Sequence, residues 1–223
     1  MPDFSKQLSK YIPEQAAPII SQWINDTACR FKVTRSRSSK LGDYRAPFRG
    51  SPHQITVNHD LNPYAFLLTT IHEFAHLKTY QDHKHRVKPH GPEWKNNFKC
   101  LIQSFLQLNI FPSDVVEAIH QYMNNPAASS CTDVNLYRVL KRYDNNITEA
   151  IHVEDLPIDA VFQLKNGRTF RKKEKHAKTL QMYRAGYQQG ISLPPYCGSI
   201  SSERKFKGLK ICILNCIFIN PKT

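Results

Sequence analysis

The order of apolar and polar residues predicts helices at the start of the chain, then short strands, then further helices. One helix is expected from about Phe4 and a second after Pro13, where apolar residues recur at three- and four-residue spacing. Alternating stretches at 29–34 and 54–58 predict two short strands. Between them, 35–53 is polar, basic and rich in Ser, Gly and Pro, so we expect a connection there.

Two proline-marked helix starts lie in the middle of the chain. Asn62 followed by Pro63 combines a capping side chain with a proline whose φ is already helical, and this helix is expected to run through Tyr80. Gly91 followed by Pro92 opens another helix that carries an apolar stripe. Both helices matter for function, because the candidate site residues lie on or just before them.

The remaining elements complete a mixed pattern. Two more helices are expected, one capped by Ser113 and one by Thr132 or Asp133. Residues 158–171 predict a β-hairpin with an Asn-Gly turn at 166–167. Helices, then strands, then helices in this order are typical of an α+β fold.

Charge and cysteine usage narrow the class of protein. The 223 residues include 31 Lys and Arg against 18 Asp and Glu, a formal net charge of +13, and residues 165–223 hold 13 of the basic residues but 2 of the acidic ones. No apolar run approaches the roughly 18 residues of a membrane-spanning helix. The six cysteines are widely scattered, which is typical of reduced thiols. We therefore expect a cytoplasmic protein with no membrane partner.

The most informative motif is His-Glu-Phe-Ala-His at 72–76, within the predicted helix that starts at Pro63. His72 and His76 are four residues apart, so both imidazoles lie on one helix face and can reach one metal ion. Glu73 lies about 100° around the helix, where a carboxylate can act on a water molecule beside the metal without binding the metal itself. The motif predicts one zinc ion with Glu73 as catalytic base.

A zinc site of this kind needs a third protein ligand. The side chains available after the motif are Asp82, His83, His85, His90 and Glu93. Asp82 is disfavoured because an early turn back to the metal needs glycine at 79, where this chain has Thr79. His90 is favoured because the following Gly-Pro allows close backbone approach and opens a rigid helix. Glu93 remains the alternative, although an acidic residue in a first helical turn already fits the helix dipole.

These motifs resemble the SprT-like metalloproteases, the family that includes bacterial SprT and eukaryotic Spartan. The resemblance rests on the pairing of HEFAH with HGPEW at 90–94, and extends over roughly residues 1–171 through KLGDYR, ITVNHDLN, NPAASSCTD and LKRYD. It implies a zincin-like metalloprotease domain with a small sheet, and zinc held by His72, His76 and His90. It also implies Glu73 as base, and cleavage of proteins bound or crosslinked to DNA. Family members usually continue into a small C-terminal zinc-ribbon-like or β element, and this chain departs from the pattern after about 173.

The expected activity is therefore that of a zinc metalloendopeptidase. Glu73 would take a proton from water during attack and return it to the leaving amine, and Tyr80 or Tyr64 would help stabilise the oxyanion. Two alternatives stay open: a general peptidase with no role at nucleic acids, and a non-catalytic DNA-binding or transcription-linked protein with structural zinc. The presence of Glu73 argues against the second alternative, because a purely structural site needs no base.

Basic residues indicate a second partner. Residues 30–49 hold seven Lys and Arg against one acidic residue, with aromatic residues among them. This mixture suits phosphate contact and base stacking, so we expect DNA, single-stranded in preference, as a partner alongside protein substrates. The candidate contacts are Arg35, Arg37, Lys40, Arg45 and Arg49.

The end of the chain is expected to differ from the rest. We predict a main domain over 1–150, a hairpin element over 151–173, and a tail over 174–223 that is disordered or arises from a shifted reading frame. Amphipathic patterning stops near 173, where lysine codons can form an adenine run prone to slippage, and 211–219 is apolar without alternation. We expect the tail to be poorly packed, with no metal site among Cys197, Cys212 and Cys216.

Overall fold

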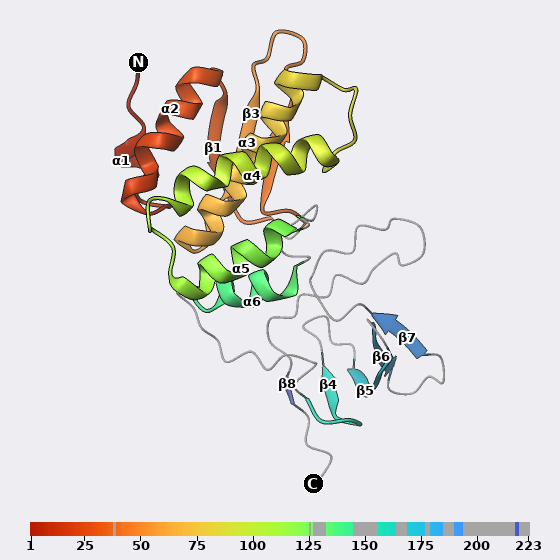
Figure 1. The fold of residues 1–223 in the computed structure, drawn as a ribbon. Coiled ribbons are helices and arrows are strands. Elements are labelled where there is room, and N and C mark those ends of the chain that lie inside the picture. Colours follow the sequence, from red (N-terminus) through yellow and green to blue (C-terminus); the bar gives the residue numbers. More distant parts are fainter. Residues whose placement is uncertain are drawn as a thin grey trace. The chain divides into compact units, whose positions relative to one another are not determined.

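The computed structural model divides the chain into two units, Met1–Asn145 and Asn146–Thr223. It describes residues 1–37, 39–124, 126, 133–144, 156–163, 169–176, 179–184, 190–193 and 217–218. In the described residues, helices dominate the first unit and strands the second (Figure 1), so the chain is α+β, as its sequence predicted.

The helices of the first unit begin where capping and proline signals place them. Described by their bounds, they are α1 (Ser5–Leu8), the 3-10 turn η1 (Glu14–Ala16), α2 (Ala17–Thr27), α3 (Pro63–His83), α4 (Pro92–Leu106), α5 (Ser113–Asn124) and α6 (Val134–Lys141). Asp133 caps α6 by accepting the N–H of Leu136 at 2.9 Å. α3 continues to His83, one turn beyond the predicted end at Tyr80.

A three-stranded sheet packs beside these helices. Its strands are β1 (Arg30–Thr34), β2 (Gly42–Arg45) and β3 (Gln54–Asn58), in the order β1-β3-β2. β1 runs parallel to β3, and β2 runs antiparallel to it. β1 and β3 confirm the two predicted strands, but 35–53 is not only a connection, because it contains β2. This edge strand is half-buried and mostly polar, so apolar alternation does not reveal it.

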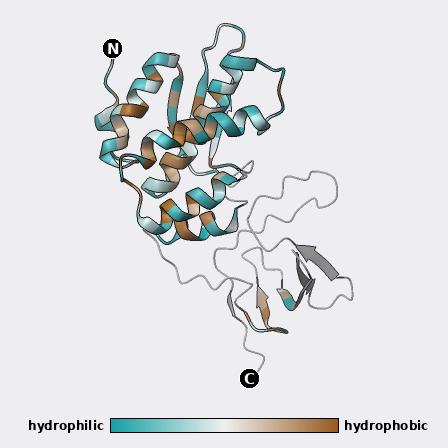
Figure 2. Cartoon of the chain, viewed as in Figure 1, coloured by the Kyte–Doolittle hydropathy of each residue, from teal (hydrophilic) through white to brown (hydrophobic). Residues whose placement is uncertain are grey.

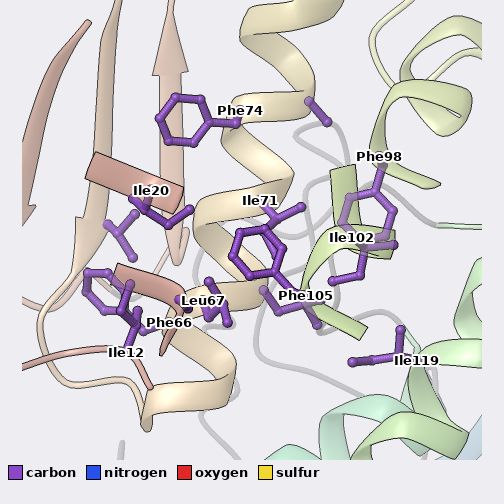
Figure 3. Packing of buried hydrophobic residues seen from close by; sticks show 14 of the residues in the cluster. Ile12, Ile20, Phe66, Leu67, Ile71, Phe74, Phe98, Ile102, Phe105 and Ile119 are labelled. Atoms are coloured by element: carbon purple, nitrogen blue, oxygen red, sulfur yellow. The ribbon is translucent and has the colours of Figure 1, made fainter. Parts of the chain in front are cut away.

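α3 is the central element of the first unit. Asn62 caps it by accepting the N–H of Ala65 at 2.9 Å, and Pro63 occupies the first helical turn. The helix contacts α4 as well as β2 and β3. In Figure 3, Phe74 points from α3 toward the strands, and Phe98 lies across α3 on the α4 side. The core therefore fixes α3 from both directions, and with it any side chain that the helix carries.

Hydropathy follows this packing. In Figure 2, brown residues run along α4 and α5 with teal residues between them, as expected for helices with one buried face. The largest fully buried side chains of the first unit include Trp94, Tyr122, Phe66 and Phe105. Among the described helices, none has both the length and the apolar character to cross a membrane.

The second unit contains antiparallel strands. They are β4 (Val161–Gln163), β5 (Thr169–His176), β6 (Thr179–Arg184), β7 (Gly190–Leu193) and β8 (Ile217–Phe218), in the order β7-β6-β5-β4-β8. β4 and β5 confirm the predicted hairpin, whose turn at 166–167 lies outside the described residues. Phe162 and Phe170, on paired positions, are fully buried with ring centroids 6.0 Å apart.

Strand pairing continues beyond 173, where the sequence predicted an unpatterned tail. β5 extends to His176 and pairs with β6, which pairs with β7. β5 is rich in lysine and lacks alternating apolar residues, so the sequence pattern does not reveal this strand. The shifted reading frame concerns the gene and stays a prediction, to be tested by sequencing the codons for 168–180. Cys197, Cys212 and Cys216 lie outside the described residues.

Candidate metal centre

Three histidines from two elements converge at one point of the first unit. His72 and His76 lie one turn apart on α3, and His90 lies in the loop just before α4. The Nε2 atom of His72 is 3.1 Å from Nε2 of His90 and 3.2 Å from Nε2 of His76. Among the described residues, these three form the one group of His, Cys, Asp or Glu side chains close enough to share an ion.

The donor set fits zinc. Zn–N bonds of 2.0–2.1 Å in tetrahedral geometry hold ligand nitrogens about 3.3 Å apart, close to the separations of the His72 nitrogen from its two partners. Three imidazoles leave a fourth position free, which is typical of catalytic rather than structural zinc sites. His90, favoured from sequence as the third ligand, is the residue that completes the cluster.

Backbone conformation brings His90 to the cluster. His90 has φ of 58°, in the left-handed region, whereas Gly91 is extended, with φ of −70° and ψ of −177°. The turn that aims the loop inward is therefore made at the histidine itself. Glycine at 91 instead lets the chain pass close to Lys88, because a β-carbon there would lie 3.0 Å from the carbonyl oxygen of Lys88.

The other candidate ligands do not join the cluster. Asp82 forms an ion pair with Lys78 at 3.4 Å and accepts the Asn97 amide at 3.3 Å. The ring of His85 lies edge-on to Tyr80, with centroids 5.0 Å apart. His83 and Glu93 are outside the cluster as well.

A tryptophan packs against all three histidines. The ring centroid of Trp94 lies 4.6, 5.4 and 4.7 Å from those of His72, His76 and His90. The side chain is fully buried and stacks on Phe98 at 5.4 Å. Its Nε1 has no hydrogen-bond partner among the described residues. The indole restricts the orientations of the imidazoles, so the ligands are fixed before an ion arrives.

Burial keeps the histidines neutral in the metal-free chain. Desolvation lowers the pKa of His76 to about 3, and it lowers the pKa of His72 and of His90 below the ordinary value of 6.5. The neighbouring imidazoles act in the same direction for His72 and His76. Neutral imidazoles have free lone pairs, which is the state that binds a metal.

Glu73 lies beside the cluster on the same helix. It is 6% exposed. Burial, and secondly the nearby charge of Asp43, raise the pKa of this carboxyl to about 8, against the opposing effect of the backbone N–H of Tyr44. In the metal-free chain the carboxyl thus exchanges its proton near neutral pH, as a general base requires.

The cluster and Glu73 open into a cleft of about 580 Å³. Besides these four side chains, its lining includes Gly42, Asp43, Tyr44, Tyr80, Lys84, Lys88 and Trp94. Of the two tyrosines proposed from sequence as oxyanion donors, Tyr80 lines the cleft. Tyr64 does not; it packs against Phe111 and Tyr143.

Sequence reasoning did not single out Tyr44 as a site residue. Its ring lies nearly parallel to that of His76, with centroids 6.4 Å apart, and its hydroxyl lies 2.9 Å from Nδ1 of His53. Burial raises the pKa of Tyr44, so the hydroxyl stays protonated and can donate. The signal that could have found it is the Gly-Asp-Tyr-Arg string, which was noted only for its family resemblance.

The five basic residues proposed to contact DNA have different environments. Arg37 donates to Asn58 at 2.8 Å and to Thr56 at 3.0 Å, so it ties the chain to β3. Lys40 and Arg45 both pair with Asp43, at 2.7 and 2.9 Å.

The two others, Arg35 and Arg49, are exposed. Arg49 lies over the ring of Phe48 at 5.1 Å, and Phe48 is itself 69% exposed. Backbone hydrogen bonds between Phe48 and Ser51 close a tight turn in which Arg49 and Gly50 have φ of 46° and 80°. The turn presents an aromatic ring and a cation to solvent at little entropic cost.

A second basic segment lies at the cleft. Residues 83–90 contain three Lys or Arg residues, three histidines and no acidic residue. Lys84 and Lys88 line the cleft. The Nζ of Lys84 lies over the Tyr80 ring at 5.2 Å.

Comparisons of the chain with protein-family models, with curated proteins and with solved structures found no match.

Proposed function

We propose that the chain is a zinc-dependent metallopeptidase with a zincin-like, SprT-like domain. The observation that carries the proposal is a buried carboxylate, Glu73, next to three converging imidazoles in an open cleft. Zinc on three histidines supplies a Lewis acid and makes water acidic near neutral pH. A structural zinc site has no use for an adjacent base or for a cleft that opens onto the ion.

The residues of the chain supply proton transfer and orientation. An oxygen of the Glu73 carboxylate accepts a proton from the attacking water as that water bonds to the scissile carbonyl carbon. The same carboxyl then gives the proton to the amide nitrogen as the C–N bond breaks, so no proton is lost or gained overall. Tyr80, at the cleft wall, donates a hydrogen bond to the carbonyl oxygen as charge develops there.

The sharpest test separates metal binding from chemistry. Glu73→Gln keeps the shape of the side chain and removes its basicity. We expect it to bind one zinc per chain by metal analysis and to lose at least about 100-fold in cleavage rate. Glu117→Gln, the same change at an exposed residue of α5, is the matched control and should behave as wild type. Cleavage that persists in Glu73→Gln would contradict the mechanism.

We propose that the substrates are proteins bound or crosslinked to DNA. Support comes from the two acid-free segments 45–53 and 83–90 and from the exposed Phe48, because cations and a flat aromatic ring suit single-stranded DNA. The segments lie against the same side chain, because the rings of His53 and His85 both pack on Tyr80, with centroids 5.7 and 5.0 Å from it.

The substrate proposal is tested with a protein crosslinked to single-stranded DNA. We expect chelator-sensitive cleavage that slows between 50 and 200 mM salt, because phosphate contacts release counterions. Arg49→Glu should slow cleavage of this substrate more than Lys10→Glu, the same reversal at an exposed N-terminal residue. Equal rates with and without DNA would favour a general peptidase. Zinc binding without any cleavage would favour a non-catalytic zinc protein.

A further inference from the structure

β2 passes so close to Glu73 that position 42 has no room for a side chain. A β-carbon on Gly42 would lie 2.5 Å from Oε1 and 2.9 Å from Cγ of Glu73. It would also lie 2.7 Å from Cγ2 of Thr69, on the same helix. Non-bonded carbon and oxygen atoms do not approach this closely, so any side chain at 42 must displace its neighbours.

The backbone of the same strand also faces Glu73. The backbone N–H of Tyr44 favours the charged form of the Glu73 carboxylate. Residues 42 and 44 point to the same side of the strand, because side chains alternate along it. Strand β2 thus makes two successive contacts with α3. Gly42 lies against Glu73, and Tyr44 lies against His76, three residues further along the helix.

β2 cannot move away to relieve a crowded contact. It pairs with β3 from Gly42↔Val57 to Arg45↔Gln54. The amide of Asn58, which is 1% exposed, donates to the carbonyl of Lys40 at 3.0 Å and so fixes the chain just before the strand. Because β3 and Asn58 fix the strand and the core fixes α3, a side chain added at 42 would displace the Glu73 carboxylate.

We infer that Gly42 is a positioning residue for Glu73. The missing side chain at 42 leaves the space that the carboxylate occupies, on the helix that carries His72 and His76. The effect of this positioning on catalysis rests on the proposed function, whereas the contact between Gly42 and Glu73 does not.

The contact is tested first in the metal-free protein, without any activity. Gly42→Ala should lower the melting temperature by roughly 4–8 °C, as over-packing a closed site does. In a Glu73→Ala background the same change should cost less than half as much, because two of the three crowded atoms are gone. If Gly42→Ala fails to fold and the double variant folds, the coupling is supported in its strongest form. Equal losses in both backgrounds would overturn the inference.

Thr69→Ser provides the matched partner, because it removes only Cγ2. If Gly42→Ala regains its full stability in the Thr69→Ser background, the crowding belongs to Thr69 and the inference is wrong. Partial recovery smaller than that produced by Glu73→Ala supports it.

Activity then distinguishes positioning from general damage. We expect Gly42→Ala to keep one zinc per chain, to change KM by less than about threefold and to lower kcat about 100-fold, the cost of a misplacement near 1 Å. Combined with Glu73→Gln it should cause no further loss. A further loss there, or a fall in zinc content, would overturn the inference. If the wild-type chain cleaves no substrate, the proposed function fails, but the stability measurements still decide the role of Gly42.

Discussion

Two of the walls of the cleft, which carry the three histidines, are built in different ways. One wall is α3, where His72 and His76 sit among buried neighbours such as Ile71 and Ala75. The other is the 84–90 loop, which begins and ends at residues with positive φ, Lys84 at 56° and His90 at 58°. Most side chains of this loop are exposed. The core thus fixes two of the candidate ligands, whereas the third is brought to them by the backbone conformation of the loop and by packing on Trp94.

This difference implies a division of labour. The helix wall would determine where an ion binds, because its geometry is part of the folded core. The loop wall supplies the third imidazole at the cost of an unfavourable backbone conformation, of order 1 kcal/mol or more. Metal binding at His90 would offset that cost, so an ion and the loop would stabilise each other.

The largest expected effect is on zinc affinity. Zinc sites in small domains bind with roughly 10–16 kcal/mol, so removing one ligand of three should weaken binding by about 1,000-fold. His76→Ala and His90→Ala should both show this loss in a competition titration with a chelator, although only one comes from the helix. His83→Ala and His85→Ala are the controls and should stay within about threefold of wild type. Equal losses across all four variants would remove the ligand assignment.

The next effect is on the free energy of unfolding, which should respond differently to substitutions in the core beside α3 and in the loop wall. Phe98 is fully buried against Trp94 and Tyr122, and Phe98→Ala should lower the free energy of unfolding by about 3 kcal/mol. Val87→Ala, in the half-buried part of the loop wall, should cost less than about 1 kcal/mol. Urea unfolding of the metal-free proteins measures both. A loss at Val87 as large as that at Phe98 would show that the loop belongs to the core.

Features that depend on local sequence could be predicted, and features that depend on tertiary packing could not. The ligand pair and its helix were accessible because i, i+4 spacing and the Asn62-Pro63 start are local properties. His90 followed from the next helix start. β2 and the contact between Gly42 and Glu73 were not accessible, because a short polar edge strand acquires its role only through tertiary packing. The ion pairs that engage Lys40 and Arg45 depend on the same strand.

A pH effect on the metal-free protein is expected next in size. The pKa of Glu73 is about 8 in the folded chain and near 4.5 when exposed, so the folded chain retains a proton that the unfolded chain releases between these values. Stability should therefore fall as pH rises from 6.5 to 8.5. The histidines act in the opposite sense, and mainly below 6.5.

The comparison of wild type with Glu73→Gln isolates this effect. Both are followed by thermal unfolding in the presence of chelator, and the wild type should lose several degrees more than the variant across that pH range. Parallel curves would mean that the folded environment does not hold the proton on Glu73.

The smallest effect concerns the start of the loop wall. Lys84 has φ of 56° and ψ of −133°, a combination that glycine adopts far more easily than lysine. Lys84→Gly should raise the free energy of unfolding by about 0.5 kcal/mol, after the loss of the cation–π contact with Tyr80. Zinc affinity should change by less than about threefold. A clear loss of stability would show that the lysine side chain, and not the backbone, holds the loop.

The indole that packs on the three imidazoles gives the chain a built-in optical probe. The sequence contains two tryptophans, and Trp23 lies against Phe74 and Phe105, whereas Trp94 touches the ligands themselves. Loading the imidazoles with an ion changes the electric field at that ring and the freedom of the rings that quench it. Emission from a Trp23→Phe chain should therefore report occupancy directly, and a stopped-flow trace would give the rate at which the ion binds.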